Sequence, residues 1–207
     1  MPDRIGNDRK RQTVGELDNN QVNARRERLM ALPFRTSGAR VLAEAWLDFA
    51  GDRLAPARTD IDPARLVEVL PNIVILEYRP PSEILFRLAG TDFFTTFDRE
   101  VTGESYLDVI ETDQRDATRR RLYSLVEYPC GLIAILGRRA DDEDRMKLES
   151  FGLPVRNSEG RIAFTLHHAD YLETVEDIRR ISMNELRALQ AQWVDIGRGA
   201  PGHPPPL

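Results

Sequence analysis

The residues best suited to acid–base or metal chemistry stand close together near the end of one segment: His167, His168 and Asp170. Over residues 161–170, large apolar side chains alternate with small or polar ones, which predicts a β-strand. Because side chains alternate across a strand, His168 and Asp170 share one face, where they could form at most a weak metal site or a pH-sensitive pair. A strand-end histidine satisfied by local hydrogen bonds is the interpretation that we favour there.

His167 lies on the opposite face of this strand, together with Thr165. If that face lines a pocket, His167 could donate a hydrogen bond to a ligand. Aromatic residues elsewhere could supply the apolar wall, since small-molecule sites combine such walls with a few polar groups. The candidates are Phe93, Phe94, Phe97, Tyr106 and Tyr123. Aromatic side chains at helical spacing more often belong to an ordinary core, and the sequence leaves both interpretations open.

Four arginines would suit a carboxylate or phosphate ligand if their side chains turned inward. Arg87 lies in a predicted strand, and the triplet at 119–121 lies on a predicted helix. For the triplet we favour a solvated helix face, because charged side chains are rarely buried without a partner.

The motifs give no support for catalysis. The chain contains no Gly-x-Ser-x-Gly elbow, no phosphate-binding glycine loop and no paired histidine–glutamate metal motif. Its single cysteine, Cys130, excludes an internal disulfide and a cysteine-rich zinc site, and no histidine is placed by sequence to activate it. The acidic segment 141–144 lacks the glycine that a calcium loop needs for its bend. We therefore predict that the protein is not an enzyme and holds no metal.

Composition and charge narrow the class of partner. The 207 residues suffice for one core with extensions, and the net charge of −5 argues against broad binding to nucleic acid or to anionic membranes. No apolar run reaches the length of a membrane span, and the polar start of the chain lacks a hydrophobic signal core, so we expect a cytoplasmic protein. Basic residues at 9–11 and 25–26 could contact an acidic partner or nucleic acid, but we favour a solvated tail.

Local patterns predict the elements that must position these side chains. A helix capped by Ser37 carries Trp46 on its apolar stripe and ends at Gly51. Asp62 and Pro63 are typical of the start of a short helix. Strands are expected over 72–79, 84–89, 132–137, 146–155 and 161–170, with short helices over 93–97 and 106–110 and a longer helix over 113–128. One side of the first hairpin needs a cover, for which the Trp46 helix is the candidate.

The end of the chain predicts one more helix. Thr174 and Asp177 are spaced as in a capping box. A short coiled-coil-like seam follows at Leu186, Leu189, Trp193 and Ile196. We therefore divide the chain into a disordered or partly helical tail at 1–36, a globular domain with N-terminal covering helices at 37–171, a C-terminal helix at 172–197 and a proline-rich tail at 198–207.

The predicted order of elements resembles the PAS fold: a hairpin, several short helices, one longer helix and a three-stranded meander. The chain is also similar, over about 43–171, to a bacterial family of small stand-alone PAS-like proteins. This second resemblance rests on the sequence motifs Asp52-Arg53-Leu54-Ala55-Pro56-Ala57-Arg58, Asp62-Pro63, Leu70-Pro71, Phe86-Arg87-Leu88-Ala89-Gly90-Thr91 and Asp98-Arg99-Glu100-Val101-Thr102-Gly103. The resemblance implies an α+β fold, with a five-stranded antiparallel sheet, short helices on one face, and N-terminal and C-terminal helical extensions.

The resemblance also implies a role as a sensor or interaction module, often dimeric, that signals through flanking helices. Haem-binding PAS domains use a histidine on the long helix, and residues 113–128 contain none. Flavin photosensors use a cysteine in an Asn-Cys-Arg motif, whereas Cys130 follows Tyr128 and Pro129. The cofactor therefore stays unidentified.

We expect a sensory or regulatory protein that binds an unidentified small ligand and signals, by protein–protein contact through its helical extensions, to a dimer mate or another partner. The alternative is a ligand-free interaction or dimerisation module whose core is filled by its own aromatic side chains.

Overall fold

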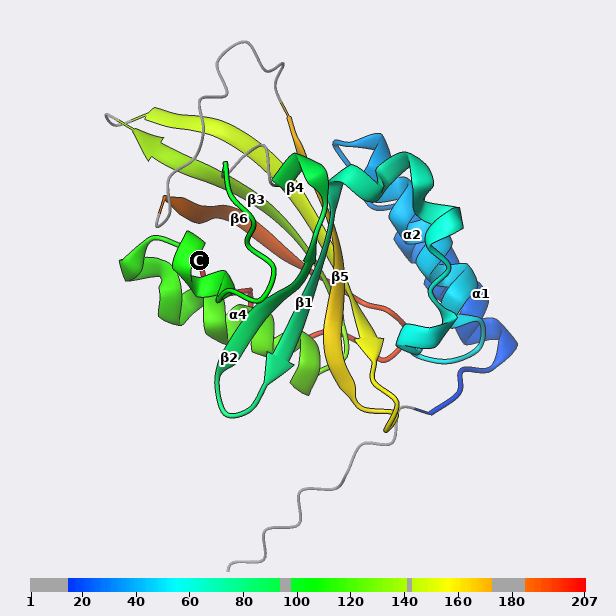
Figure 1. Ribbon diagram of the computed structural model, residues 1–207. Coiled ribbons are helices and arrows are strands. Elements are labelled where there is room, and N and C mark those ends of the chain that lie inside the picture. Colours follow the sequence, from blue (N-terminus) through cyan, green and yellow to red (C-terminus); the bar gives the residue numbers. More distant parts are fainter. Residues whose placement is uncertain (1–14, 94–97, 141–142, 173–184) are drawn as a thin grey trace, which may run out of the picture.

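A computed structural model describes residues 15–93, 98–140, 143–172 and 185–207. Six strands form one sheet in the order β2-β1-β5-β4-β3-β6, and every neighbouring pair is antiparallel (Figure 1). The strands are β1 (Ile73–Arg79), β2 (Glu83–Ala89), β3 (Gly131–Ala140), β4 (Glu143–Arg156), β5 (Ile162–Tyr171) and β6 (Leu186–Val194). Among the helices of these residues, none has the length and apolar character needed to cross a membrane.

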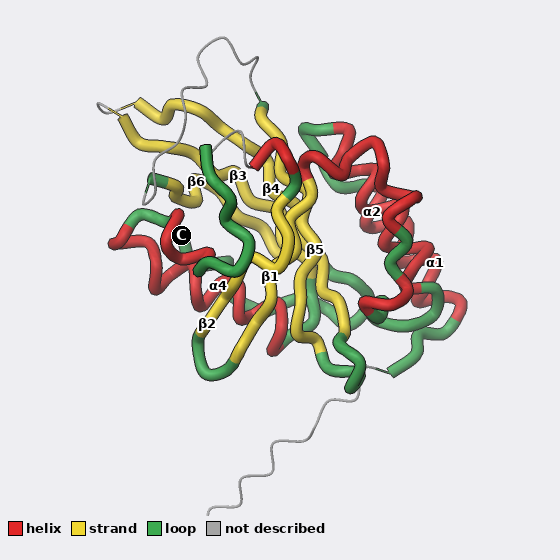
Figure 2. The backbone as a smooth tube through the Cα atoms, in the orientation of Figure 1, coloured by secondary structure: helices red, strands yellow, loops and turns green. Residues whose placement is uncertain are grey.

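Helices cover both faces of the sheet, as Figure 2 shows in red on either side of the yellow strands. The outer face carries α1 (Asn19–Met30), α2 (Ser37–Ala50) and the 3₁₀ helix η2 (Pro63–Asn72), which follows the 3₁₀ turn η1 (Arg58–Asp60). The inner face carries α4 (Arg115–Glu127), preceded by the 3₁₀ turns η3 (Tyr106–Val109) and η4 (Thr112–Gln114). Residues on the two faces of β1, β3, β4 and β5 therefore enter two separate hydrophobic cores, one on each face of the sheet.

The helix that bears Trp46 lies on the outer face of the sheet, but it packs mainly on β4 and β5 rather than on the β1–β2 hairpin that it was predicted to cover. Trp46 is fully buried, and its Nε1 donates a hydrogen bond of 3.0 Å to the carbonyl oxygen of Pro154 on β4. Helix α2 ends at Gly51, which has a positive φ of 60°. Asp62 accepts a hydrogen bond from the backbone nitrogen of Ala64, with Pro63 in the first position of η2. The predicted end of α2 at Gly51 and the predicted helix start at Asp62 and Pro63 are confirmed.

The start of α2 differs from the prediction in one respect. The helix begins at Ser37, but its N-cap is Thr36, whose own side chain caps nothing. The donors ahead of the first turn are satisfied instead by the carboxylate of Glu149, which β4 supplies from the sheet. This contact ties the N-terminus of α2 to the outer face.

Within the N-terminal tail that was predicted as disordered or partly helical, residues 19–30 form helix α1. Asp18 and Gln21 form a capping box that opens α1. Arg25 is fully buried, because its guanidinium donates to the carbonyls of Arg53 (2.8 Å) and Gly51 (2.5 Å) at the end of α2. The solvated-tail interpretation was therefore wrong for Arg25, while residues 9–11 lie outside the described part.

The predicted C-terminal helix is wrong where the structure describes it, because Leu186–Val194 forms strand β6. This strand pairs with the otherwise free edge of β3, so the sheet has six strands rather than five. The buried residues Leu186, Ala188 and Trp193 follow a two-residue alternation with one irregularity in register opposite Ile135 and Leu136. Pairing with β3 satisfies a whole row of backbone groups, which outweighs a short helical seam. The predicted helix start at Thr174 and Asp177 lies outside the described residues.

Candidate functional site

A chain of polar side chains crosses the inner face of the sheet inside an otherwise apolar core. The hydroxyl of Tyr78 on β1 lies 3.0 Å from Thr165 Oγ1, which lies 2.7 Å from His167 Nε2. On the far side of the imidazole, Ser150 Oγ of β4 lies 3.5 Å from His167 Nδ1. The prediction that Thr165 and His167 share a face is confirmed, and that face meets the inner core. Tyr78 and Ser150 were not anticipated, because each approaches His167 from another strand.

These buried groups are neutral at physiological pH. Burial lowers the pKa of His167 from its ordinary 6.5 to about 4, because a charged imidazole would lose its hydration. Burial also raises the pKa of the Tyr78 hydroxyl, although the hydrogen bond to Thr165 acts in the other direction. A neutral imidazole has one donor and one acceptor nitrogen, and in this network Nε2 faces the hydroxyl of Thr165 and Nδ1 faces that of Ser150.

The space beside His167 is narrow because Gly152 of β4 lies against the imidazole. A Cβ atom at Gly152 would come within 2.2 Å of His167 Cε1. A side chain at this position would displace the ring, so glycine is required for the network to form.

Two of the predicted aromatic residues converge on Phe86 of β2. The ring centroid of Phe86 lies 5.3 Å from that of Tyr106 and 6.1 Å from that of Phe93. Tyr123 lies on α4, and its ring meets the ring of Tyr78 edge-on, with the two ring centroids 5.5 Å apart. Its hydroxyl donates to the carbonyls of Arg79 and Glu83 in the hairpin between β1 and β2. The predicted residues Phe94 and Phe97 lie outside the described part of the chain.

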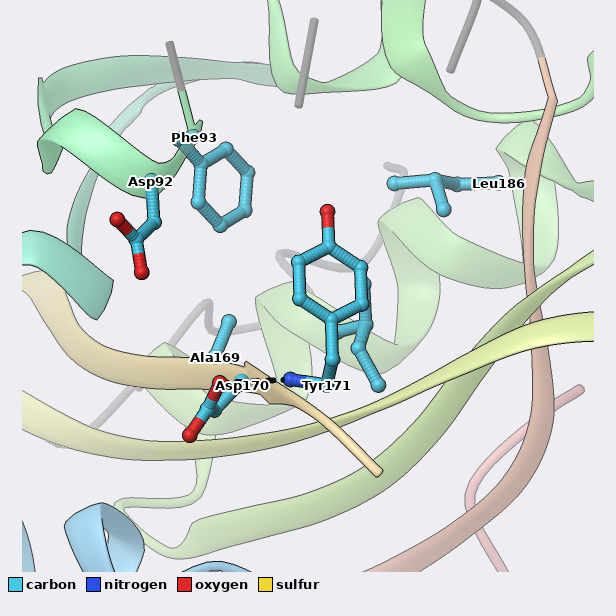
Figure 3. Close-up of a pocket in the computed structure, with 7 residues that line it drawn as sticks. Asp92, Phe93, Ala169, Asp170, Tyr171 and Leu186 are labelled. Carbon is cyan, nitrogen blue, oxygen red and sulfur yellow. Dashed lines mark hydrogen bonds between the residues drawn. The ribbon is translucent and has the colours of Figure 1, made fainter. Parts of the chain in front are cut away.

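A small pocket opens on the inner side at the end of β5 (Figure 3). Its lining residues are Asp92, Phe93, Leu148, Ala169, Asp170, Tyr171 and Leu186. Its interior volume is about 10 Å³, which is room for roughly one water molecule. Ala169 follows His167 by two positions on the same face of β5, so the pocket continues the face that carries the polar chain.

Of the predicted residues that the structure describes, Phe93 lines the pocket, and Figure 3 shows its ring across the opening from Tyr171. Leu186 closes another side and comes from β6, the strand that was predicted as a helix. Sequence reasoning therefore missed Tyr171 and Leu186. The signal for Tyr171 was present, since it continues the alternation of Thr165, His167 and Ala169.

His168 faces the outer side of the sheet against helix α2. A Cβ atom at Gly38 would lie only 2.0 Å from His168 Nε2, which shows how closely the imidazole packs on the helix. Burial lowers the pKa of His168, and the negative charges of Asp170 and Glu149 act in the other direction. Within the described residues, no group of three His, Cys, Asp or Glu side chains could hold a metal ion.

The remaining candidates, the thiol of Cys130 and the four arginines, differ in how deeply they are buried. Cys130 is fully buried, and burial raises the pKa of its thiol to about 12, so the thiol stays protonated at neutral pH. Arg87 and Arg120 are exposed, and Arg119 pairs with Asp116. Arg121 is buried, so a solvated face is the wrong interpretation for this member of the triplet.

The chain is similar to a family model and, more distantly, to solved structures. A family model described as a PAS domain matches residues 25–166. Among solved structures, the chain is similar to a light-oxygen-voltage domain studied with a flavin analogue, at 18% identity over 55% of this chain and 84% of that chain, with a TM-score of 0.41. It is also similar to the PAS domain of a protein from Colwellia psychrerythraea, at 10% identity over 52% of this chain and 94% of that chain, with a TM-score of 0.39. No curated protein matches the chain.

Proposed function

The chain belongs to the PAS domain family, and from that premise we propose that it is a cytoplasmic sensory or regulatory protein that binds a small molecule on the inner face of its sheet. Members of this family are typically sensory signalling modules rather than catalysts. In this proposal the bound molecule alters how the protein contacts a dimer mate or another protein partner, and the chain performs no catalysis of its own.

The buried polar chain of Tyr78, Thr165 and His167 is the observation that carries this proposal. Burying polar groups in an apolar core costs free energy unless they are hydrogen-bonded, and here the three side chains bond to one another. In this proposal, a polar group of the ligand exchanges with one of these hydrogen bonds. Their face continues into the wall of the pocket beside Phe93 and Tyr171. A few convergent polar groups within aromatic walls are typical of small-molecule sites.

The charge state of this network restricts the ligand. The lowered pKa of His167 and the raised pKa of Tyr78 keep both side chains uncharged. An ionised ligand group beside them would lose its hydration without gaining a counter-charge. The ligand expected here is therefore a neutral molecule with a hydrogen-bonding group, such as a carbonyl or hydroxyl, on an apolar or aromatic body.

Native mass spectrometry and absorption spectroscopy of the purified protein test the proposal. We expect an adduct of defined mass that is released on denaturation and lost in His167→Ala. The matched control is His203→Ala, because His203 is exposed and lies outside the inner core. A protein without any adduct, and without binding to a library of neutral aromatic compounds, would contradict ligand binding.

The second candidate is a ligand-free interaction module, and a specific observation favours it. Phe93 and Tyr106 both pack against Phe86 on the inner face, and the pocket beside Phe93 holds about one water. The earlier expectation of a helical dimer seam does not apply to β6, where Trp193 is buried within the fold. Large apolar side chains are exposed instead at Val67 (62%) and Leu70 (36%) of η2.

Sedimentation distinguishes this second candidate. If η2 forms a self-association surface, Val67→Ser with Leu70→Ser should shift the sedimentation coefficient to that of a monomer, because exposed apolar side chains are typical of interfaces. The same coefficient in the parent and the double variant would remove η2 from consideration.

A further inference from the structure

Arg121 is a buried cation without a carboxylate partner among the described residues. Only 3% of its surface is exposed. Its guanidinium donates to two neutral acceptors, the hydroxyl of Thr118 at 3.0 Å and the carbonyl oxygen of Pro206. Three acidic residues near α4 pair with other arginines: Asp116 with Arg119, Glu111 with Arg187 and Asp108 with Arg115.

The electrostatic surroundings of Arg121 agree with this geometry. Burial lowers the pKa of its guanidinium, and the only described group that acts in the other direction is the hydroxyl of Tyr106. Arginine nevertheless keeps its charge in proteins. A charge removed from water is costly unless an opposite charge compensates it, so this site holds an incompletely compensated cation.

The C-terminal end of the chain covers this cation. Figure 1 shows the C-terminus beside α4. Two contacts hold the covering segment, residues 203–206: Trp193 Nε1 donates to the carbonyl of His203 at 2.8 Å, and Arg121 donates to that of Pro206. Pro205 is buried, whereas Pro204 before it and Leu207 at the end of the chain are exposed. The segment thus offers the site one apolar ring and one neutral oxygen.

We propose that Arg121 is the anion-binding group of a ligand site that the covering segment occupies, and that an apolar carboxylic acid displaces the segment. A carboxylate can form two parallel charge-assisted hydrogen bonds with a guanidinium, where the Pro206 carbonyl supplies one neutral acceptor. The apolar body of such an acid takes the place that the Pro205 ring leaves. This site is separate from the polar chain around His167, whose neutral groups suit an uncharged ligand, so the two proposals stand or fall independently.

Release of the segment can be followed by a spin label at Gly202. A side chain at this position meets nothing within 4 Å, so Gly202→Cys places a label just ahead of the segment without a clash. The native thiol of Cys130 is buried and does not compete for the label. The probe is benzoate, and benzyl alcohol is its uncharged control. We expect benzoate, but not benzyl alcohol, to increase the mobility of the label, because release of the segment frees the backbone that carries it.

Calorimetric titration of benzoate gives the second measurement. A segment that occupies the site lowers the apparent affinity by the fraction of molecules that are open. A chain that ends at His203 should therefore bind benzoate about tenfold more tightly, or more, if the segment is released in at most about a tenth of the molecules. Arg121→Gln should abolish this binding, and Arg121→Lys should weaken it because an ammonium group lacks the planar fork. Arg120→Gln is the matched control, since Arg120 is exposed on the same helix.

Three results would overturn the proposal. Benzoate could leave the mobility of the label unchanged and fail to bind the chain that ends at His203. It could bind Arg121→Gln as tightly as the parent protein. Benzyl alcohol could release the segment as well as benzoate does, which would assign the effect to the apolar ring alone. Because the shortened chain retains Arg121, it tests the site even if Arg121→Gln fails to fold.

Discussion

Removal of the Glu149 carboxylate should loosen helix α2 from the sheet. Glu149 is 1% exposed, and its Oε1 accepts hydrogen bonds from the backbone nitrogen (3.0 Å) and the hydroxyl (2.9 Å) of Thr36. Its Oε2 accepts from the backbone nitrogen of Arg35 at 2.8 Å. These donors precede the first turn of α2, where the helix has no partners of its own and its dipole favours negative charge. Glu149→Ala leaves all three donors without an acceptor.

The three hydrogen bonds of Glu149 determine how much stability its removal should cost. An unpaired buried donor costs about 1–3 kcal/mol. The two Thr36 donors are buried and the Arg35 nitrogen is partly buried, so we expect Glu149→Ala to lower the free energy of unfolding by about 3–5 kcal/mol. Glu149→Gln keeps one oxygen for Thr36 but turns an amide NH₂ group toward the Arg35 donor. Its expected loss is smaller, about 1.5–3 kcal/mol.

Urea unfolding followed by circular dichroism measures both losses, as a lower midpoint at an unchanged slope. Glu159→Ala is the control, because the Glu159 side chain is 64% exposed in its pair with Arg161. That variant should lose less than about 1 kcal/mol. If Glu149→Ala lost no more than the control, or if Glu149→Gln cost as much as Glu149→Ala, the capping of α2 by β4 would be refuted.

Three further predictions concern buried groups. Burial lowers the pKa of His167 in the folded protein from 6.5 to about 4, so between these pH values the unfolded chain binds more protons than the folded one. The free energy of unfolding should therefore fall as the pH drops from 6.5 to 4, by on the order of 3 kcal/mol relative to His167→Gln. Urea unfolding of both proteins at each pH measures this difference. An equal pH dependence in both proteins would contradict a buried neutral imidazole. Gly38→Ala places a Cβ against His168 and should lower the thermal midpoint by an amount equivalent to about 1–3 kcal/mol, whereas Gly202→Ala, with open space around it, should not. Cys130 should resist a thiol reagent in the native protein and react fully in urea, and fast native labelling would show that the inner core opens.

Much of the fold could be predicted because its signals are local. The two-residue alternation along β5 placed His167 and Thr165 on one face, and the structure confirms it. The Asp62-Pro63 helix start and the Gly51 helix end depend only on neighbouring residues, and both are present. The order of these elements sufficed for the α+β class and for the PAS family.

The candidate site was harder to predict because its members come from separate strands. His167 was selected, but its partners Tyr78 and Ser150 lie on β1 and β4, at positions that only strand register brings together. Similarly, the residue that closes the N-terminus of α2 is Glu149, 113 positions away from Thr36. Among neighbouring residues Ser37 is the best candidate for a helix cap, because Glu149 lies on a strand that is distant in the sequence.

By itself, the sequence determined the local elements, the two faces of β5 and the family, because each follows from residues that are close in the chain. Only the tertiary structure decided the fate of the C-terminal region and of Arg121. Residues 186–194 became a strand because β3 offered an unpaired edge, and Arg121 became a buried cation because residues 203–206 folded back over it. Both outcomes depend on which distant surface is available, and hydrophobic spacing carries no information about that.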